Sequence, residues 1–210
     1  MMGYSTILTY PKIWRTGRKV SFHNYDYIKS IAPSPYYYEL TREDIKGFRA
    51  FWDKFKELNV EKHPFLDVTI RRFNFSYDKR LPQDKLIDLI TAFEALFLPG
   101  EERELRYRLA LRCAYFLGDN GNERKRIFDV MRGAYDIRSK IVHGGELPQC
   151  TSINKILKKL NMPSLLELSM QVEEYLRNSI KLFLDYLQSK SREEIIKQTD
   201  AKVIMREITE

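Results

Sequence analysis

Cysteine and histidine are scarce in this chain of 210 residues, which has two cysteines and three histidines. Cys113 falls within an apolar helical pattern and Cys150 within a loop-like stretch. A disulfide framework is therefore not expected, and a reducing cytoplasm is the natural environment. The few histidines and cysteines do not have the spacing of metal ligands, which argues against structural zinc. We expect neither a metal nor a cofactor, since the sequence also has no phosphate loop and no dinucleotide fingerprint.

Long apolar runs are also missing from the sequence. No run approaches the roughly 18 consecutive residues needed to cross a bilayer. The first residues combine neither the basic leader nor the cleavage site of a secretory signal. The sequence therefore predicts a cytoplasmic protein that makes no membrane contact.

Charge, in contrast, is abundant and unbalanced. Charged residues make up 31 % of the chain, hydrophobic residues 43 %, and the net charge is +7. This hydrophobic content indicates a globular chain and not a disordered one. The positive excess fits an anionic partner, of which nucleic acid is the commonest, and fits equally well a charge that only keeps the protein soluble.

The first forty residues differ from the rest in their density of aromatic side chains. Two extended-looking runs, residues 7–10 and 19–22, flank a Thr-Gly pair and could form a β-hairpin. Pro33 and Pro35 then interrupt any regular element. We interpret residues 1–40 as a separate aromatic-rich N-terminal segment, which is either irregular or a β-hairpin.

From residue 41 to 190, apolar residues recur at three- and four-residue spacing, which is the period of an amphipathic helix. Ser164 with Glu167 resembles a capping box at the start of the last long helix. The expected helices span about 41–58, 64–77, 82–98, 101–117, 122–142 and 163–190. Short connections between them predict an all-α antiparallel bundle over residues 41–190. Residues 191–210 are expected to be a polar, loosely held C-terminal tail.

The most informative segment is residues 135–145, which read YDIRSKIVHGG. His143 lies in the last turn of its expected helix, and the glycine pair after it can end that helix. Tyr135, Ser139 and His143 are four residues apart and share one face, whereas Arg138 lies on a neighbouring strip. This residue pair suits metal-free RNA cleavage. A histidine can accept the proton of a ribose 2′-hydroxyl near neutral pH, and an arginine can stabilise the charge that develops on the phosphate.

Spacing alone leaves a plainer explanation open. A cation in the last turn of a helix is stabilised by the helix dipole, and an arginine and a histidine five residues apart arise often by chance in a basic chain. Arg138 and His143 also do not stack on one another at this spacing. A long arginine reach or a second copy of the helix would be needed to bring both to one phosphate.

The segment and its neighbours resemble the Apea-like family of the HEPN superfamily. The resemblance rests on the Arg-x4-His spacing of Arg138 and His143 within YDxRSKxVHG, on AFEAL at residues 92–96 and on RLA at residues 108–110. It extends over about residues 81–186. It implies a helical bundle that forms a homodimer through the motif helices, so that two motifs meet in one composite cleft.

The same resemblance implies roles for individual residues. Arg138 and His143 would be catalytic, and three residues would support them: Ser139, Glu94 and Tyr135. Weaker candidates for RNA contacts are Lys140, Arg108 and Arg112. This sequence departs from the family at two positions, because Ser139 stands where many ribonuclease members have Asn, Asp or His, and Gly145 stands where some toxin members have a modifiable tyrosine.

The function expected on these grounds is that of a metal-independent endoribonuclease in phage defence, a toxin–antitoxin pair or a stress response. Its partners would be RNA or a nucleotide, a second copy of the chain and, in some settings, an antitoxin or another defence protein. Two alternatives stay open. One is a non-catalytic module that binds nucleotides or RNA or serves to dimerise, and the other is a helical partner protein without a small ligand.

Overall fold

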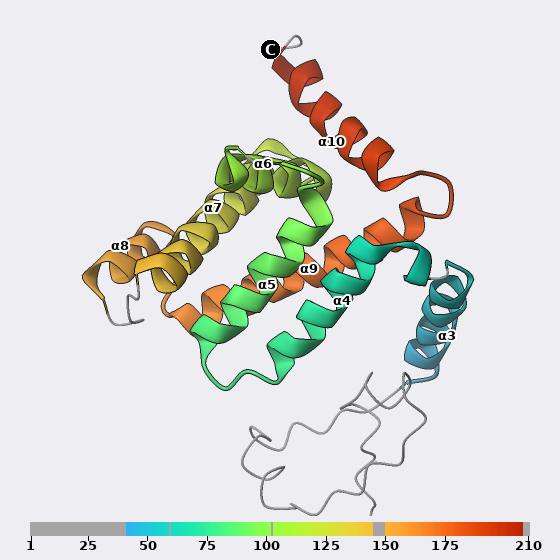
Figure 1. Cartoon of the computed structure of the whole chain (residues 1–210), viewed down its shortest axis with the longest axis horizontal. Coiled ribbons are helices and arrows are strands. Elements are labelled where there is room, and N and C mark those ends of the chain that lie inside the picture. Colours follow the sequence, from blue (N-terminus) through green and yellow to red (C-terminus); the bar gives the residue numbers. More distant parts are fainter. Residues whose placement is uncertain (1–40, 59, 102, 145–149, 208–210) are drawn as a thin grey trace, which may run out of the picture. The chain divides into compact units, whose positions relative to one another are not determined.

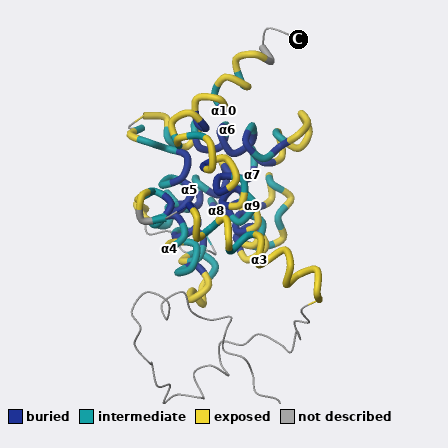
Figure 2. Tube along the Cα trace, turned by 90° about the vertical axis from the view of Figure 1, so that its right-hand side faces the viewer, coloured by how far each residue is buried: buried dark blue, intermediate teal, exposed yellow. Residues whose placement is uncertain are grey.

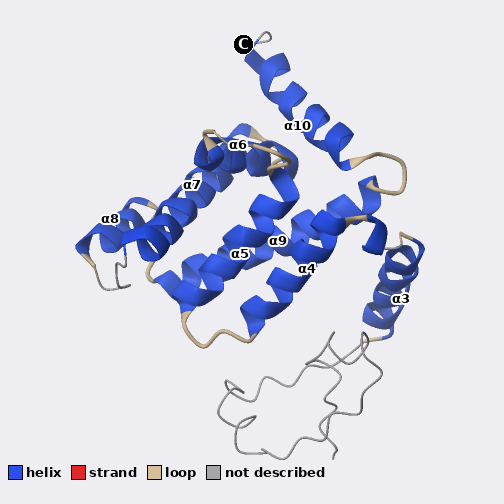
Figure 3. Cartoon of the chain, in the orientation of Figure 1, coloured by secondary structure: helices blue, strands red, loops and turns tan. Residues whose placement is uncertain are grey.

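The computed structural model describes residues 41–58, 60–101, 103–144 and 150–207. These residues form eight α-helices and no strand, as Figure 3 shows, so the all-α class is confirmed for this part of the chain. The helices are α3 (Arg42–Glu57), α4 (Pro64–Tyr77), α5 (Pro82–Phe97), α6 (Leu105–Leu117), α7 (Gly121–Gly144), α8 (Thr151–Lys159), α9 (Leu165–Tyr186) and α10 (Arg192–Glu207). The N-terminal β-hairpin that we considered lies outside the described residues.

The helices pack as a bundle around α9. Helices α4 and α5 are joined by a short turn and lie side by side in opposite directions, as Figure 1 shows. Helices α6 and α7 form a second contacting pair, and α9 packs against all four of these helices. Two helices that matter for the site, α5 and α7, also contact each other directly.

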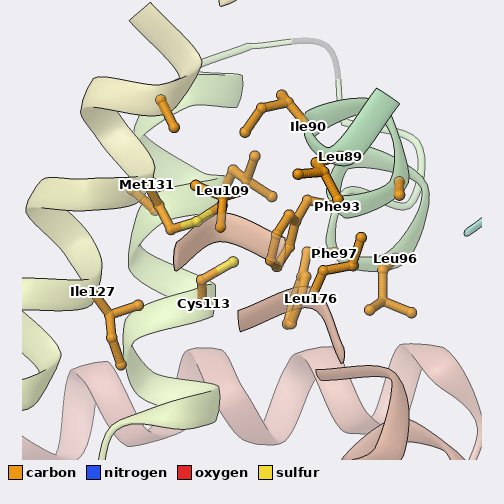
Figure 4. Close-up of a cluster of buried hydrophobic side chains, with 14 of the residues drawn as sticks. Leu89, Ile90, Phe93, Leu96, Phe97, Leu109, Cys113, Ile127, Met131 and Leu176 are labelled. Carbon is orange, nitrogen blue, oxygen red and sulfur yellow. The ribbon is translucent and has the colours of Figure 1, made fainter. Parts of the chain in front are cut away.

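The core of the bundle is rich in phenylalanine. The ring of Phe183 in α9 lies 5.3 Å from the ring of Phe97 in α5 and 4.8 Å from that of Phe116 in α6. Figure 4 shows Phe93 and Phe97 of α5 in one buried cluster with side chains from other helices, among them Met131 of α7. The Phe97–Phe183 pair is edge-to-face, an arrangement that stabilises a core beyond the area that it buries. Figure 2 shows that the buried parts of the trace lie where these helices face one another.

Local signals in the sequence explain several helix ends. The Ser164 hydroxyl accepts a hydrogen bond from the Glu167 amide at 3.2 Å, which confirms the predicted cap of α9. Helix α5 begins at Pro82, whose missing amide hydrogen is not needed in a first turn. Helix α6 begins at Leu105 and not at Glu101, since the acidic residues before it lie outside the helix.

Two helices were missed by the sequence analysis. Helix α8 occupies part of the expected loop, and it buries Ile153 and Leu157. Helix α10 forms in the segment that was expected to be a loosely held tail, so that expectation is wrong for residues 192–207. Ile195 and Ile196 of α10 are buried, and Asp200 pairs with the buried Arg112 of α6 at 2.9 Å. These contacts hold the polar segment to the bundle.

Within the described ranges, no helix is both long and apolar enough to span a membrane.

Candidate active site

Helix α7 carries the motif, and its two ends are defined by local sequence. At its start, Asn120 Oδ1 accepts a hydrogen bond from the Glu123 amide at 3.0 Å, and the Glu123 carboxylate accepts one from the Asp119 amide at 2.9 Å. This reciprocal pattern satisfies amide groups that a helix start leaves free. The helix ends at Gly144, directly after His143. Its apolar side, which includes Ile137, is buried, and this sets the direction of every other side chain on α7.

Arg138 reaches across to α5, where it meets Glu94. Its Nη2 atom lies 3.3 Å from Glu94 Oε2, and only 18 % and 22 % of the two side chains are exposed. The guanidinium also lies over the ring of Tyr135, at 5.8 Å from the ring centroid. The Nε atom of Arg138 is buried and has no acceptor within the described part of the chain. Arg138 is thus held in place by Glu94, and its Nε–H group still lacks an acceptor among the described residues.

Tyr135 completes this cluster. Burial raises the pKa of its hydroxyl, and the negative charge of Glu94 and a hydrogen bond to that carboxylate raise it further. The positive charge of Arg138 acts in the opposite direction. Tyr135 therefore stays protonated and donates to Glu94, so that the carboxylate contacts both the tyrosine and the arginine. The structure brings together three of the expected site residues.

His143 stands apart from this cluster within one chain. Its side chain is exposed at the end of α7. Five residues along a helix place it about 140° around the axis and about 7.5 Å along the axis from Arg138. Ser139 and Lys140, which lie between them, are half-buried. A single chain thus presents an oriented arginine and an exposed histidine on different sides of the same helix end.

Two of the three arginines of α6 were considered for RNA contacts, and both have other partners. Arg112 is buried, and it donates to the Phe97 carbonyl at 2.7 Å, to Glu101 at 2.8 Å and to Asp200 at 2.9 Å. Arg108 also pairs with Glu101, at 3.0 Å. As placed, Arg112 joins α5, α6 and α10, and it could contact RNA only if α10 moved away.

The sequence analysis overlooked one ion pair beside the site. Arg106 of α6 lies 2.7 Å from Asp136 of α7, the aspartate of the YDxRSK string. The pair fixes the beginning of α6 against the motif helix. Asp136 stands in the YDxRSK string, but the sequence does not indicate that it pairs with Arg106, which is 30 residues away.

No metal site accompanies this cluster, since no group of three or more potential ligands gathers in the described part of the chain. The comparisons with known proteins give no neighbour: no family model, no curated protein and no solved structure matches the chain.

Proposed function

We propose that the chain is a metal-independent endoribonuclease of the HEPN type, which acts as a homodimer with Arg138 and His143 as its catalytic residues. One observation supports this most directly. Arg138 is oriented by Glu94 from a neighbouring helix, and His143 is exposed on the same helix one and a half turns later. The proposal includes a role in phage defence or a toxin–antitoxin pair, where a protein antitoxin would be a further partner.

The reaction would be an attack within the RNA chain. His143 takes the proton of a ribose 2′-hydroxyl, the 2′-oxygen forms a bond to the adjacent phosphorus, and the bond from phosphorus to the 5′-oxygen breaks. The departing 5′-oxygen receives a proton from an imidazolium or from water. The products are a 2′,3′-cyclic phosphate and a 5′-hydroxyl, so charge and atoms balance without a further reagent.

Arg138 would stabilise the additional negative charge on the phosphate oxygens. A guanidinium that is already oriented loses little freedom when the transition state forms, which makes its electrostatic effect larger. Among the described residues Glu94 engages one N–H group of Arg138, through Nη2, and a guanidinium has five N–H donors that could serve a phosphate. The resemblance places the second motif of a dimer opposite the first, which would bring the histidine of one chain to the arginine of the other.

The test is cleavage of a mixed pool of labelled RNAs by the purified full chain in excess EDTA. We expect cleavage that leaves 2′,3′-cyclic phosphate ends and that disappears in Arg138→Ala/His143→Ala. The matched control is Arg71→Ala/His63→Ala, which removes the same residue types at α4, where the exposed Arg71 pairs with Asp67 of the same helix. Equal cleavage by wild type and by the catalytic double variant would overturn the proposal.

A second candidate function is a non-catalytic module that binds nucleotides or RNA. It is favoured by the contacts of Glu94 with Tyr135 and Arg138. An arginine whose charge is balanced by a carboxylate can stabilise the fold without taking part in catalysis. In that case the wild-type chain would bind RNA or nucleotides without cleaving any RNA of the pool.

A further inference from the structure

A groove lies between α6 and α7, near the start of α7 and far along that helix from His143. Its volume is about 250 Å³. This is a little below the roughly 300 to 1,000 Å³ of pockets that enclose whole small molecules, and it suits one flat group. The walls include Tyr107, Tyr115, Phe128, Arg124, Lys125 and Gly121.

The aromatic walls include one tyrosine that is exposed and held by a second ring. Tyr107 packs edge-to-face on Phe128, with the ring centroids 5.7 Å apart and an angle of 78° between the planes. Half of Tyr107 is exposed, at 50 % of its surface. Tyr115, in contrast, is covered by the guanidinium of Arg124 at 4.9 Å. The position of Gly121 has no side chain to narrow the groove. An exposed tyrosine held by a second ring is a platform on which a planar ligand can stack.

The rim of the groove is cationic. Arg124 is fixed by its hydrogen bonds to the carbonyls of Gly118, at 2.9 Å, and Asp119, at 3.2 Å. Lys125 is 76 % exposed, and its only described partner is the exposed Asp129 on the next turn. Such an exposed pair contributes little and is easily exchanged for a phosphate. Arg132 is exposed one turn beyond Phe128 and has no partner in the part of the chain that the structure describes.

Two of these cations, Lys125 and Arg132, lie on the same line along α7 as His143. At about 100° per residue, Lys125, Arg132 and His143 fall within about 20° of one line along the helix. The distance from Lys125 to His143 along the axis is about 27 Å at about 1.5 Å per residue. The buried side of α7 faces the opposite way, so this line runs along the solvent face.

We infer that the groove at Tyr107 and Phe128 is a base-binding subsite for single-stranded RNA, whose phosphates follow Lys125 and Arg132 toward His143. This inference deepens the proposed function and rests on it for the identity of the ligand. An unpaired strand is required, because the bases of a duplex are stacked on each other and cannot present a face to Tyr107. The positive charges of the rim suit a phosphate backbone, and the tyrosine ring can stack on a base of any sequence.

The experiment measures binding of a labelled oligouridylate, long enough to span about 27 Å, to the full chain carrying His143→Ala so that the RNA is not cut. We expect Tyr107→Ala to weaken binding roughly tenfold, which is the usual effect of losing one base stack. Tyr107→Trp should retain tight binding. The matched control is Tyr186→Ala, since Tyr186 is also exposed, at 37 %, and packs edge-to-face on Phe116 at 5.8 Å.

Two further measurements separate stacking from charge and from folding. Lys125→Glu/Arg132→Glu should reduce the slope of log affinity against log salt by roughly two. Lys181→Glu/Lys202→Glu, which changes two exposed lysines on α9 and α10, should leave that slope nearly unchanged. A dinucleotide, too short to reach from the groove to His143, should bind the Tyr107 parent weakly and Tyr107→Ala more weakly still, because the groove supplies its base stack.

The outcomes separate this inference from the proposed function. If RNA cleavage depends on Arg138 and His143 while Tyr107→Ala binds the oligouridylate as well as its control does, the subsite is wrong and the ribonuclease function is supported. If Tyr107→Ala and the charge variant bind the oligouridylate more weakly while no RNA is cleaved, the subsite is supported and the ribonuclease function is wrong. If the oligouridylate does not bind at all, the subsite is overturned, and the cleavage assay alone decides the function.

Discussion

Arg138 of α7 and Glu94 of α5 form an ion pair with Nη2 and Oε2 3.3 Å apart, although the two residues are 44 positions apart in the sequence. About a fifth of each side chain is exposed, at 18 % and 22 %. A pair in this position is less screened by water than a pair on the open surface. It fixes both the contact between the two helices and the direction of the arginine.

We predict that this pair is more strongly coupled than the neighbouring surface pair of Arg106 and Asp136, of which 45 % and 31 % are exposed. In a double-mutant cycle with alanine, Arg138 and Glu94 should show a coupling free energy of about 1 kcal/mol or more. Arg106 and Asp136 should show about 0.2 to 1 kcal/mol, as exposed pairs do. Urea unfolding of the wild type and of the three variants in each cycle measures both values. A larger coupling for the surface pair would contradict the assignment of Arg138 to a fixed position.

The sequence analysis predicted the long helices well because their burial follows a simple period. Each of them presents a stripe of apolar residues over three or more turns, and Pro82 and Ser164 mark where two of them begin. Helix α8 is only nine residues long, and its two buried residues make too short a pattern to distinguish a helix from a loop. The apolar residues of helix α10 are spread around the helix and form no single stripe, and it is stabilised by contacts that depend on the folded bundle.

The candidate site was predictable in part for a similar reason. The string around Arg138 identified α7 as the motif helix, and the resemblance associated Glu94 with it; the structure places the two residues in contact. The sequence also indicated that Arg138 and His143 point in different directions, since five residues do not complete whole turns. It could not show that Arg112 is buried beside Asp200, because that contact joins residues 88 positions apart.

A pair of glycine substitutions should have different effects on stability. A Cβ atom at Gly133 of α7 would lie 2.6 Å from Leu160 Cδ1 and 3.2 Å from Ile156 Cγ2, whereas one at Gly47 of α3 would meet nothing within 4 Å. Gly47→Ala should therefore stabilise α3 by up to about 1 kcal/mol through helix propensity. In Gly133→Ala, crowding against Leu160 should cancel the gain in helix propensity. Gly133→Val should lower the free energy of unfolding by roughly 1 to 3 kcal/mol. Circular dichroism and urea unfolding of the three variants measure the difference.

The same crowding predicts a compensating change. Leu160→Ala shortens the side chain that the new Cβ atom would meet, so Gly133→Ala should be tolerated better in a Leu160→Ala background than in the wild type. Additive losses in the double variant would show that Gly133 does not determine how closely α8 approaches α7.

The attachment of α10 should depend more on Arg112 than on Asp200. The Arg112 side chain is 5 % exposed and has two carboxylate partners, and 43 % of Asp200 is exposed. Arg112→Ala leaves the Phe97 carbonyl without this donor and Glu101 with Arg108 alone, and it should cost roughly 3 to 5 kcal/mol. Asp200→Asn leaves Glu101 in place and should cost about 1 kcal/mol or less. Hydrogen exchange should show faster opening of α10 in both variants, and equal costs would contradict the central role of Arg112.

Tyr77 of α4 should make the fold sensitive to alkali. Burial of its hydroxyl and a hydrogen bond to Glu173 raise its pKa from 10.0 to about 12, against the influence of Arg177. The unfolded chain therefore loses this proton near pH 10.0 and the folded chain near pH 12. The stabilisation is complete below the lower value and is lost as the pH rises through the higher one.

The measurement is urea unfolding of the wild type and Tyr77→Phe from neutral pH upward. The wild type should lose stability relative to Tyr77→Phe between pH 10.0 and about 12. Tyr107→Phe is the control, since the Tyr107 hydroxyl has no hydrogen bond among the residues that the structure describes. A constant difference between wild type and Tyr77→Phe over this range would show that the hydroxyl titrates normally.

The angular separation of Arg138 and His143 leads to a prediction about the dimer. Within one chain the two side chains lie about 140° apart around α7, so a catalytic pair would form from the arginine of one chain and the histidine of its partner. Arg138→Ala and His143→Ala should each be inactive alone. After the two are unfolded together and refolded as a mixture, about half of the dimers are mixed, and each has one complete site, so roughly a quarter of the wild-type activity should return. A pair acting within one chain has no complete site in any of these dimers, and the mixture would then stay inactive.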